Sequence, residues 1–135
     1  VLAASKDERI RNLISLAGMV NTKNFYDREF GEEKPDEGCM WEEPSCPLSS
    51  TYKNDMYTIG SVAAMASEVK VPWLLIHGDA DDVVPIEDSR EIFAHANEPK
   101  KIIEIPGANH VFSEGGLGPM SESVIDWIGE ILRES

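Results

Sequence analysis

The sequence has few cysteines, and this shortage excludes two classes of protein. Only Cys39 and Cys46 occur among the 135 residues, too few for a disulfide framework. Their spacing is wide for a zinc knuckle, and no second pair of ligands follows. We therefore expect two free thiols, with one disulfide as the alternative, no bound metal and a cytoplasmic location.

Basic residues and long apolar runs are also scarce. The chain has 12 lysines and arginines against 25 acids, a net charge of −13. This charge repels phosphate backbones and anionic lipids, so we expect no nucleic acid partner. No apolar run approaches the roughly 20 residues of a membrane span, so we expect no membrane partner either. The length is sufficient for one domain with an apolar core.

What the sequence does contain is an alternation of short apolar runs and helical periodicities. The run Leu13–Gly18 closes at a glycine and is typical of a strand buried on both faces. Strands separated by helical crossovers predict an α/β fold with a parallel sheet and flanking helices. The predicted strands are 13–17, 71–77 and 101–105, and the predicted helices are 50–57, 61–68, 85–96 and 120–132. The last helix has an apolar stripe of Met120, Val124, Trp127, Ile128, Ile131 and Leu132.

Residues 21–60 interrupt this alternation. They are rich in acids and prolines, and aromatic side chains such as Phe25 and Trp41 are scattered through them. A long irregular stretch inside a domain is typical of a lid or a binding loop, and the aromatics argue against pure disorder. We expect one α/β domain over 1–135, with 21–60 as a cap-like insertion.

Two residues with catalytic chemistry follow neighbouring strands. Asp81 comes after strand 71–77, and His110 comes after strand 101–105. Loops at the carboxyl ends of parallel strands gather on one rim of a sheet, so the two side chains are expected to meet. An acid and then a histidine in this order form the second half of a Ser…Asp…His triad.

The surrounding motifs carry a family resemblance. Gly78-x-x-Asp81-x-x-Val84-Pro85, followed by Gly107-Ala108-Asn109-His110-x-Phe112, resembles the C-terminal half of the α/β-hydrolases. The branch it resembles includes esterases, lipases and serine aminopeptidases. The resemblance implies that Asp81 is the catalytic acid and His110 the catalytic base, with no cofactor and no metal.

The nucleophile that this family requires is missing. No Gly-x-Ser-x-Gly occurs in the sequence, and neither Ser61 nor Ser113 has the flanking glycines. The resemblance implies a serine before Val1 and hydrolysis of an acyl ester, or less favourably of an amide. The alternative is a non-catalytic binding or interaction module on an incomplete hydrolase scaffold.

Other polar residues near these motifs have simpler interpretations. Asp79 and Asp82 compete with Asp81, but the position of Val84-Pro85 favours Asp81. This acidic turn lacks the glycine and glutamate of a calcium-binding EF-hand loop. His77 ends a buried strand and is expected to be structural, whereas His95 can cap a helix.

Two predictions concern surfaces. Met19, Trp41 and Phe112 are candidates for binding an ester-like substrate. The alternative for the insertion's aromatics is that they pin it to the sheet. Strand 13–17 is expected to have an uncovered edge, which favours a homo-oligomer.

Overall fold

The computed structural model describes residues 1–113 and 115–134, which form two compact units. The first unit contains Val1–Val20 and Ala63–Ser135, and the second contains Asn21–Val62. The second unit spans nearly the same residues as the predicted insertion. Whether it acts as a cap stays a prediction.

A three-stranded parallel sheet forms the centre of the first unit. Its strands are β1 (Leu13–Leu16), β2 (Trp73–Gly78) and β3 (Lys100–Ile105), in the order β1-β2-β3. Trp73 lies opposite Leu13 on one side and opposite Lys100 on the other. The predicted α/β class and parallel sheet are therefore confirmed.

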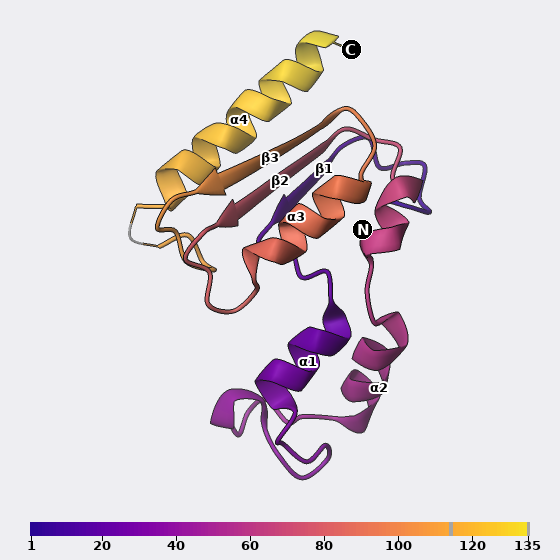
Figure 1. Cartoon of the computed structure of the whole chain (residues 1–135), viewed down its shortest axis with the longest axis vertical. Coiled ribbons are helices and arrows are strands. Elements are labelled where there is room, and N and C mark those ends of the chain that lie inside the picture. Colours follow the sequence, from indigo (N-terminus) through magenta and orange to yellow (C-terminus); the bar gives the residue numbers. More distant parts are fainter. Residues whose placement is uncertain (114, 135) are drawn as a thin grey trace. The chain divides into compact units, whose positions relative to one another are not determined.

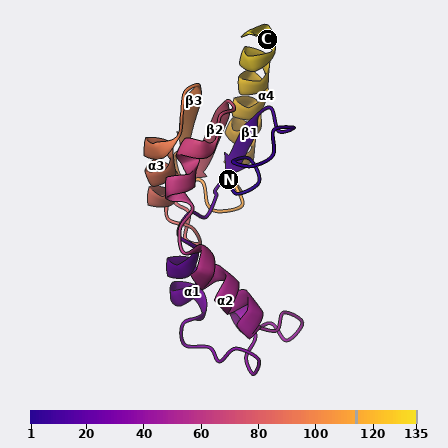
Figure 2. The same ribbon diagram turned by 90° about the vertical axis from the view of Figure 1, so that its right-hand side faces the viewer.

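Helices cover both faces of this sheet. The helix α3 (Ile86–His95) lies on one face and α4 (Leu117–Glu134) on the other (Figures 1 and 2). A 3-10 helix, η2 (Ala63–Glu68), packs against α3 where the sequence predicted a helix over 61–68. The central strand β2 is consequently buried along its whole length.

The prediction that strand 13–17 is buried on both faces is wrong. Leu16 is 45% exposed, and the other β1 residues are only partly buried. The reason is the position of β1 at the edge of the sheet, where only β2 pairs with it in the described part of the chain. An apolar run alone does not distinguish a central strand from such an edge.

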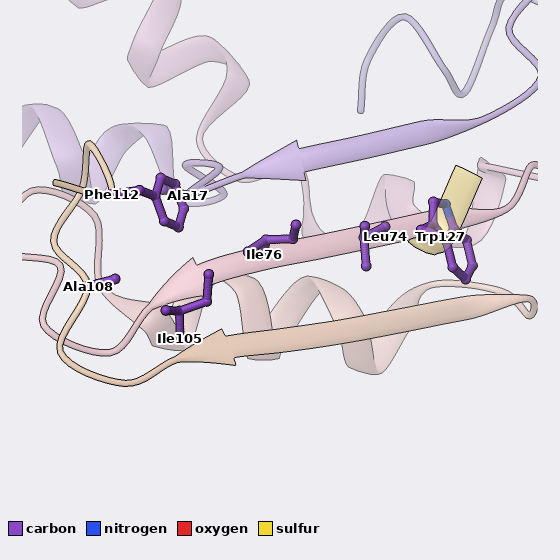
Figure 3. Close-up of a cluster of buried hydrophobic side chains, with 7 residues drawn as sticks. All are labelled: Ala17, Leu74, Ile76, Ile105, Ala108, Phe112 and Trp127. Atoms are coloured by element: carbon purple, nitrogen blue, oxygen red, sulfur yellow. The ribbon is translucent and has the colours of Figure 1, made fainter. Parts of the chain in front are cut away.

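The main core lies between the sheet and α4. Trp127 packs there, and its indole Nε1–H donates to Asn12 Oδ1 at 3.1 Å. Met120, Val124 and Ile131 pack against the same core, whereas Ile128 and Leu132 of the predicted stripe are exposed because they lie on a flank of α4 that the sheet does not cover. The buried members of this cluster are Ala17, Leu74, Ile76, Ile105, Ala108, Phe112 and Trp127 (Figure 3).

The second unit is more regular than its sequence predicts. It contains α1 (Thr22–Phe30), η1 (Met40–Glu42) and α2 (Ser50–Ile59), of which only α2 was predicted, as 50–57. Ser49 caps α2 by accepting the N–H of Tyr52. An aromatic cluster holds the unit together, with ring centroids 5.0–6.3 Å apart. Its members are Phe25, Tyr26, Phe30, Trp41, Tyr52 and Tyr57.

Cys39 and Cys46 both carry free thiols in this unit. Across residues 1–113 and 115–134, no helix combines the length and apolarity needed to cross a membrane.

Candidate functional site

Two loops at the carboxyl ends of β2 and β3 are joined by hydrogen bonds. The backbone N–H of Ala80 donates to the carbonyl of Ala108 at 3.1 Å. The carboxylate of Asp79 accepts the N–H of Gly107 at 2.6 Å, which ties the loops together a second time. Asp79, a rival to Asp81 in the sequence, is thus occupied in holding the loops together.

The contact between the loops requires a glycine at position 78. A Cβ on Gly78 would lie 2.1 Å from the Ala108 carbonyl oxygen and 2.6 Å from its carbon. Both distances are far below van der Waals contact, and the obstacle is backbone. Gly107, at φ +71°, forms the turn that brings the second loop back towards the first. These two motif glycines therefore set the distance between the loops.

Asp81 and His110 meet where these loops come together. His110 Nδ1 lies 2.9 Å from Asp81 Oδ2. The other oxygen, Oδ1, accepts the N–H groups of Val83 at 2.9 Å and Val84 at 2.8 Å. The Asp81 side chain is 0% exposed, whereas that of His110 is 34% exposed. The acid is therefore fixed in the protein, and the histidine reaches solvent.

The charge of Asp81 determines which nitrogen of His110 carries the proton. Burial raises the pKa of Asp81, but hydrogen bonds from Val84, His110 and Val83 outweigh burial and hold it below its ordinary value. An ionised carboxylate only accepts hydrogen bonds, so Nδ1 of His110 is the donor. Nε2 then carries the lone pair, and no residue that the structure describes bonds to it.

A second histidine also touches Asp81. His77 Nε2 lies 3.1 Å from Asp81 Oδ2 and 2.9 Å from the carbonyl oxygen of Val84. His77 Nδ1 lies 2.7 Å from the hydroxyl of Ser89. The sequence predicts a structural role for His77 but not its contact with Asp81. The available signal was its place at the end of a buried strand, four residues before Asp81.

The three candidates for substrate binding lie in different environments. Phe112 is buried in the core cluster, in the turn that carries His110 (Figure 3). Met19 borders a cavity of about 20 Å³ together with Trp73 and Ser89, which is smaller than any organic substrate. Trp41 belongs to the second unit, is exposed, and packs edge-on against Phe30. Their role in binding stays a prediction.

Two larger hollows lie elsewhere. One of 430 Å³ is lined by residues such as Asp7 and Glu68, and one of 560 Å³ lies along α2 near Tyr52. Neither is lined by Asp81 or His110. The chemistry-bearing residues thus lie outside both hollows.

Known proteins share this arrangement of elements. Est1E from Butyrivibrio proteoclasticus superimposes with a TM-score of 0.79 at 25% identity, over 97% of this chain and 55% of that one. Mouse alpha/beta hydrolase domain-containing protein 10 superimposes with a TM-score of 0.70 at 18% identity, over 96% and 56% of the two chains. The chain thus covers about half of each structure.

Sequence relatives agree with the structural ones. Uncharacterized protein YfhR of Escherichia coli K12 is 35% identical over 88 residues, which are 64% of this chain and 28% of YfhR. YfhR of Salmonella typhimurium is 42% identical over 52 residues, 38% and 18% of the two chains. The chain therefore spans less than a third of the curated relatives it matches.

The sequence profile of one family matches half of the chain. This profile is described as serine aminopeptidase, S33, and it matches residues 47–114. The match includes β2, the Asp81 turn, β3 and His110. Together with the parallel sheet and its two loops, it shows that this chain belongs to the S33 serine aminopeptidase family, with the α/β-hydrolase fold.

Proposed function

We propose that the protein is a serine hydrolase that cleaves acyl esters, with His110 as the catalytic base and Asp81 as the acid that orients it. One observation carries this proposal. His110 donates Nδ1–H to a buried, ionised carboxylate, its ring is partly exposed, and no described residue bonds to its Nε2. This is the arrangement that a nucleophilic hydroxyl needs from its base. The nucleophile itself is a serine outside these 135 residues.

The proposed chemistry has two halves. The serine hydroxyl attacks the acyl carbon, and His110 Nε2 takes its proton. The tetrahedral intermediate then collapses, the ester C–O bond breaks, and the alcohol leaves with the proton from Nε2. A water molecule next attacks the acyl-enzyme, again giving its proton to Nε2, and the carboxylic acid and the free serine are released. Asp81 stabilises the imidazolium in both halves.

The ester class is supported by a structural relative. Est1E, at 26% identity in a second structure with a TM-score of 0.78, is described with ferulic acid bound. Ferulic acid is a carboxylic acid, the kind of product that hydrolysis of an acyl ester releases. The description of the matching family names an aminopeptidase, so an amide substrate is the second class that an assay must include.

The test compares variants of the full-length protein. p-Nitrophenyl esters of two to eight acyl carbons and an aminoacyl p-nitroanilide are the substrates. His110→Ala should lower ester turnover by about 10³-fold or more, because the base is removed. His95→Ala is the matched control, since His95 is exposed on α3 and its Nδ1 bonds the carbonyl of Glu91 in the same helix. It should retain wild-type turnover.

Three results would contradict the proposal in whole or in part. Wild-type ester turnover in His110→Ala would show that this histidine is not the base. Failure of a fluorophosphonate probe to label any serine of the full-length protein would show that no activated nucleophile exists. The second result would favour the binding-module function over hydrolysis. Faster cleavage of the anilide than of every ester would reassign the substrate class.

A further inference from the structure

Two imidazole rings contact the same oxygen of the Asp81 carboxylate. His110 Nδ1 lies 2.9 Å from Oδ2, and His77 Nε2 lies 3.1 Å from the same oxygen. The two rings differ in their surroundings, because His77 is fully buried and His110 is partly exposed. Only the His110 ring can therefore reach a substrate.

The partners of His77 determine where its protons lie. The Val84 carbonyl oxygen only accepts hydrogen bonds, so His77 Nε2, at 2.9 Å, must carry a hydrogen. The Ser89 hydroxyl can then donate to the lone pair on Nδ1, at 2.7 Å. Ser89 is itself buried, so bulk water does not compete for this bond. Both ring nitrogens are thus engaged, and the ring is fixed in orientation.

This ring closes a network around the Asp81 turn. Val84 donates its N–H to Asp81 Oδ1, and its carbonyl receives the Nε2–H of His77. The same Nε2 lies 3.1 Å from Asp81 Oδ2. His77 therefore contacts the turn at the backbone of Val84 and at the carboxylate of Asp81. A turn held at both places has less freedom to rotate the carboxylate away from His110.

The sequence Ser89–His77–Asp81 has the partners of a second triad, but its burial excludes this role. Ser89 and His77 are at most 1% exposed, so no acyl carbon can reach the hydroxyl. In addition, Ser89 lies against Nδ1 while Nε2 is bonded to a backbone carbonyl. The group is consequently a support for Asp81 and not a separate active site.

We propose that His77, held in place by Ser89, is a positioning residue that fixes the Asp81 carboxylate for its hydrogen bond with His110. The catalytic part of this inference rests on the proposed function. The structural part does not, because it concerns the geometry of the Asp81–His110 pair whether or not the protein turns over a substrate.

Two substitutions in the full-length protein test whether the side chain at position 77 must place a hydrogen-bond donor where Nε2 lies, or whether any polar side chain is sufficient. The amide nitrogen of glutamine in His77→Gln can occupy the place of Nε2 and donate to Val84 and Asp81. The amide nitrogen of asparagine in His77→Asn corresponds to Nδ1 and does not reach Val84 or Asp81. His95→Gln is the control for replacing a histidine. The first readout is the downfield proton NMR signal of the His110 Nδ1–H, and the second is kcat and KM for a p-nitrophenyl ester.

In His77→Asn we expect the His110 Nδ1–H signal to broaden or disappear and kcat to fall about 10- to 100-fold with KM unchanged. This range corresponds to the loss of one hydrogen bond near a charged group. His77→Gln should restore the signal and most of kcat, and His95→Gln should match the wild type. An unchanged signal and kcat in folded His77→Asn would overturn the proposal, even if the variant melts at a lower temperature.

A third variant keeps the test decisive if His77→Asn does not fold. Ser89→Ala removes one hydroxyl and leaves the imidazole in place; it should weaken the same signal and lower kcat about 2- to 10-fold. An unchanged signal in Ser89→Ala would then overturn the proposal. Failure of the proposed function gives a different pattern. In that case the substitutions at His77 leave ester turnover unchanged, while the NMR signal of the His110 Nδ1–H still changes in His77→Asn.

Discussion

Replacing Gly78 by alanine should separate the two loops that bring Asp81 and His110 together. The added Cβ would lie 2.1 Å from the Ala108 carbonyl oxygen. The backbone at Ala108 or at position 78 must therefore move by more than the few tenths of an ångström that relieve an ordinary tight contact. The hydrogen bonds from Ala80 to Ala108 and from Gly107 to Asp79 lie directly beside this point.

The magnitude follows from these contacts. Overpacking in a tight site costs about 1–3 kcal/mol. Loss of the two hydrogen bonds adds about 1 kcal/mol each. Replacing a glycine stabilises the folded state by about 0.4–1 kcal/mol, because the unfolded chain has less freedom to lose. Gly78→Ala should therefore lower the free energy of unfolding by about 2–5 kcal/mol.

The assay is urea denaturation of the full-length protein, followed by circular dichroism, with ester turnover as a second readout. Gly118→Ala is the matched control, because the residue is in α4 and, apart from its own helix backbone and chain neighbours, no described atom lies within 4 Å of a Cβ there. Alanine in a helix should leave the protein as stable as the wild type or up to about 1 kcal/mol more stable. Equal stabilities of Gly78→Ala and Gly118→Ala would refute the argument that Gly78 sets the loop distance.

Three further predictions test the core, the acid and the sheet edge. Trp127→Ala should cost about 3–5 kcal/mol in chemical denaturation, because a buried indole and its hydrogen bond to Asn12 are lost. Ile125→Ala, on the exposed side of α4, should cost less than about 0.5 kcal/mol. An equal cost of the two substitutions would show that Ile125 is covered in the protein. The folded pKa of Asp81 lies below its ordinary value of 3.8, so its stabilisation is full above pH 3.8 and is lost as the pH falls through the folded pKa. Denaturation at several pH values should therefore show a shallower loss of stability below pH 3.8 in Asp81→Asn than in the wild type, and identical slopes would contradict this. Residues 1–135 alone should form dimers or larger species in light scattering at micromolar concentration, because β1 is an edge strand with a partly exposed apolar face. A clean monomer would contradict this prediction.

The fold was largely readable from local patterns. The apolar runs that became β2 and β3 are bounded by turn residues, and the Trp127 periodicity is strong enough to identify α4. The helix α1 was missed because its buried residues, such as Phe25 and Phe30, are interspersed with charged ones that obscure the apolar face. Its stability comes from aromatic contacts with residues such as Tyr52, which lie far along the chain.

The edge position of β1 also depends on neighbours that a short run cannot reveal. Leu13–Leu16 has the composition of a central strand, but its burial is decided by how many strands lie beside it. The same holds for Ile128 and Leu132, which fit the apolar stripe of α4 and nevertheless lie beyond the area that the sheet covers.

By itself, the sequence determined the chemistry available to this protein: one acid and one histidine, each placed after a strand, because strand order and loop composition are local properties. Only the tertiary structure decided which groups touch. It brought His110 to within 2.9 Å of the Asp81 carboxylate, bound Asp79 to the backbone N–H of Gly107, and placed His77 against the same oxygen of Asp81 that His110 contacts. Hydrogen bonding requires distances near 3 Å, and such distances between residues far apart in the chain arise only when the sheet brings its loops together.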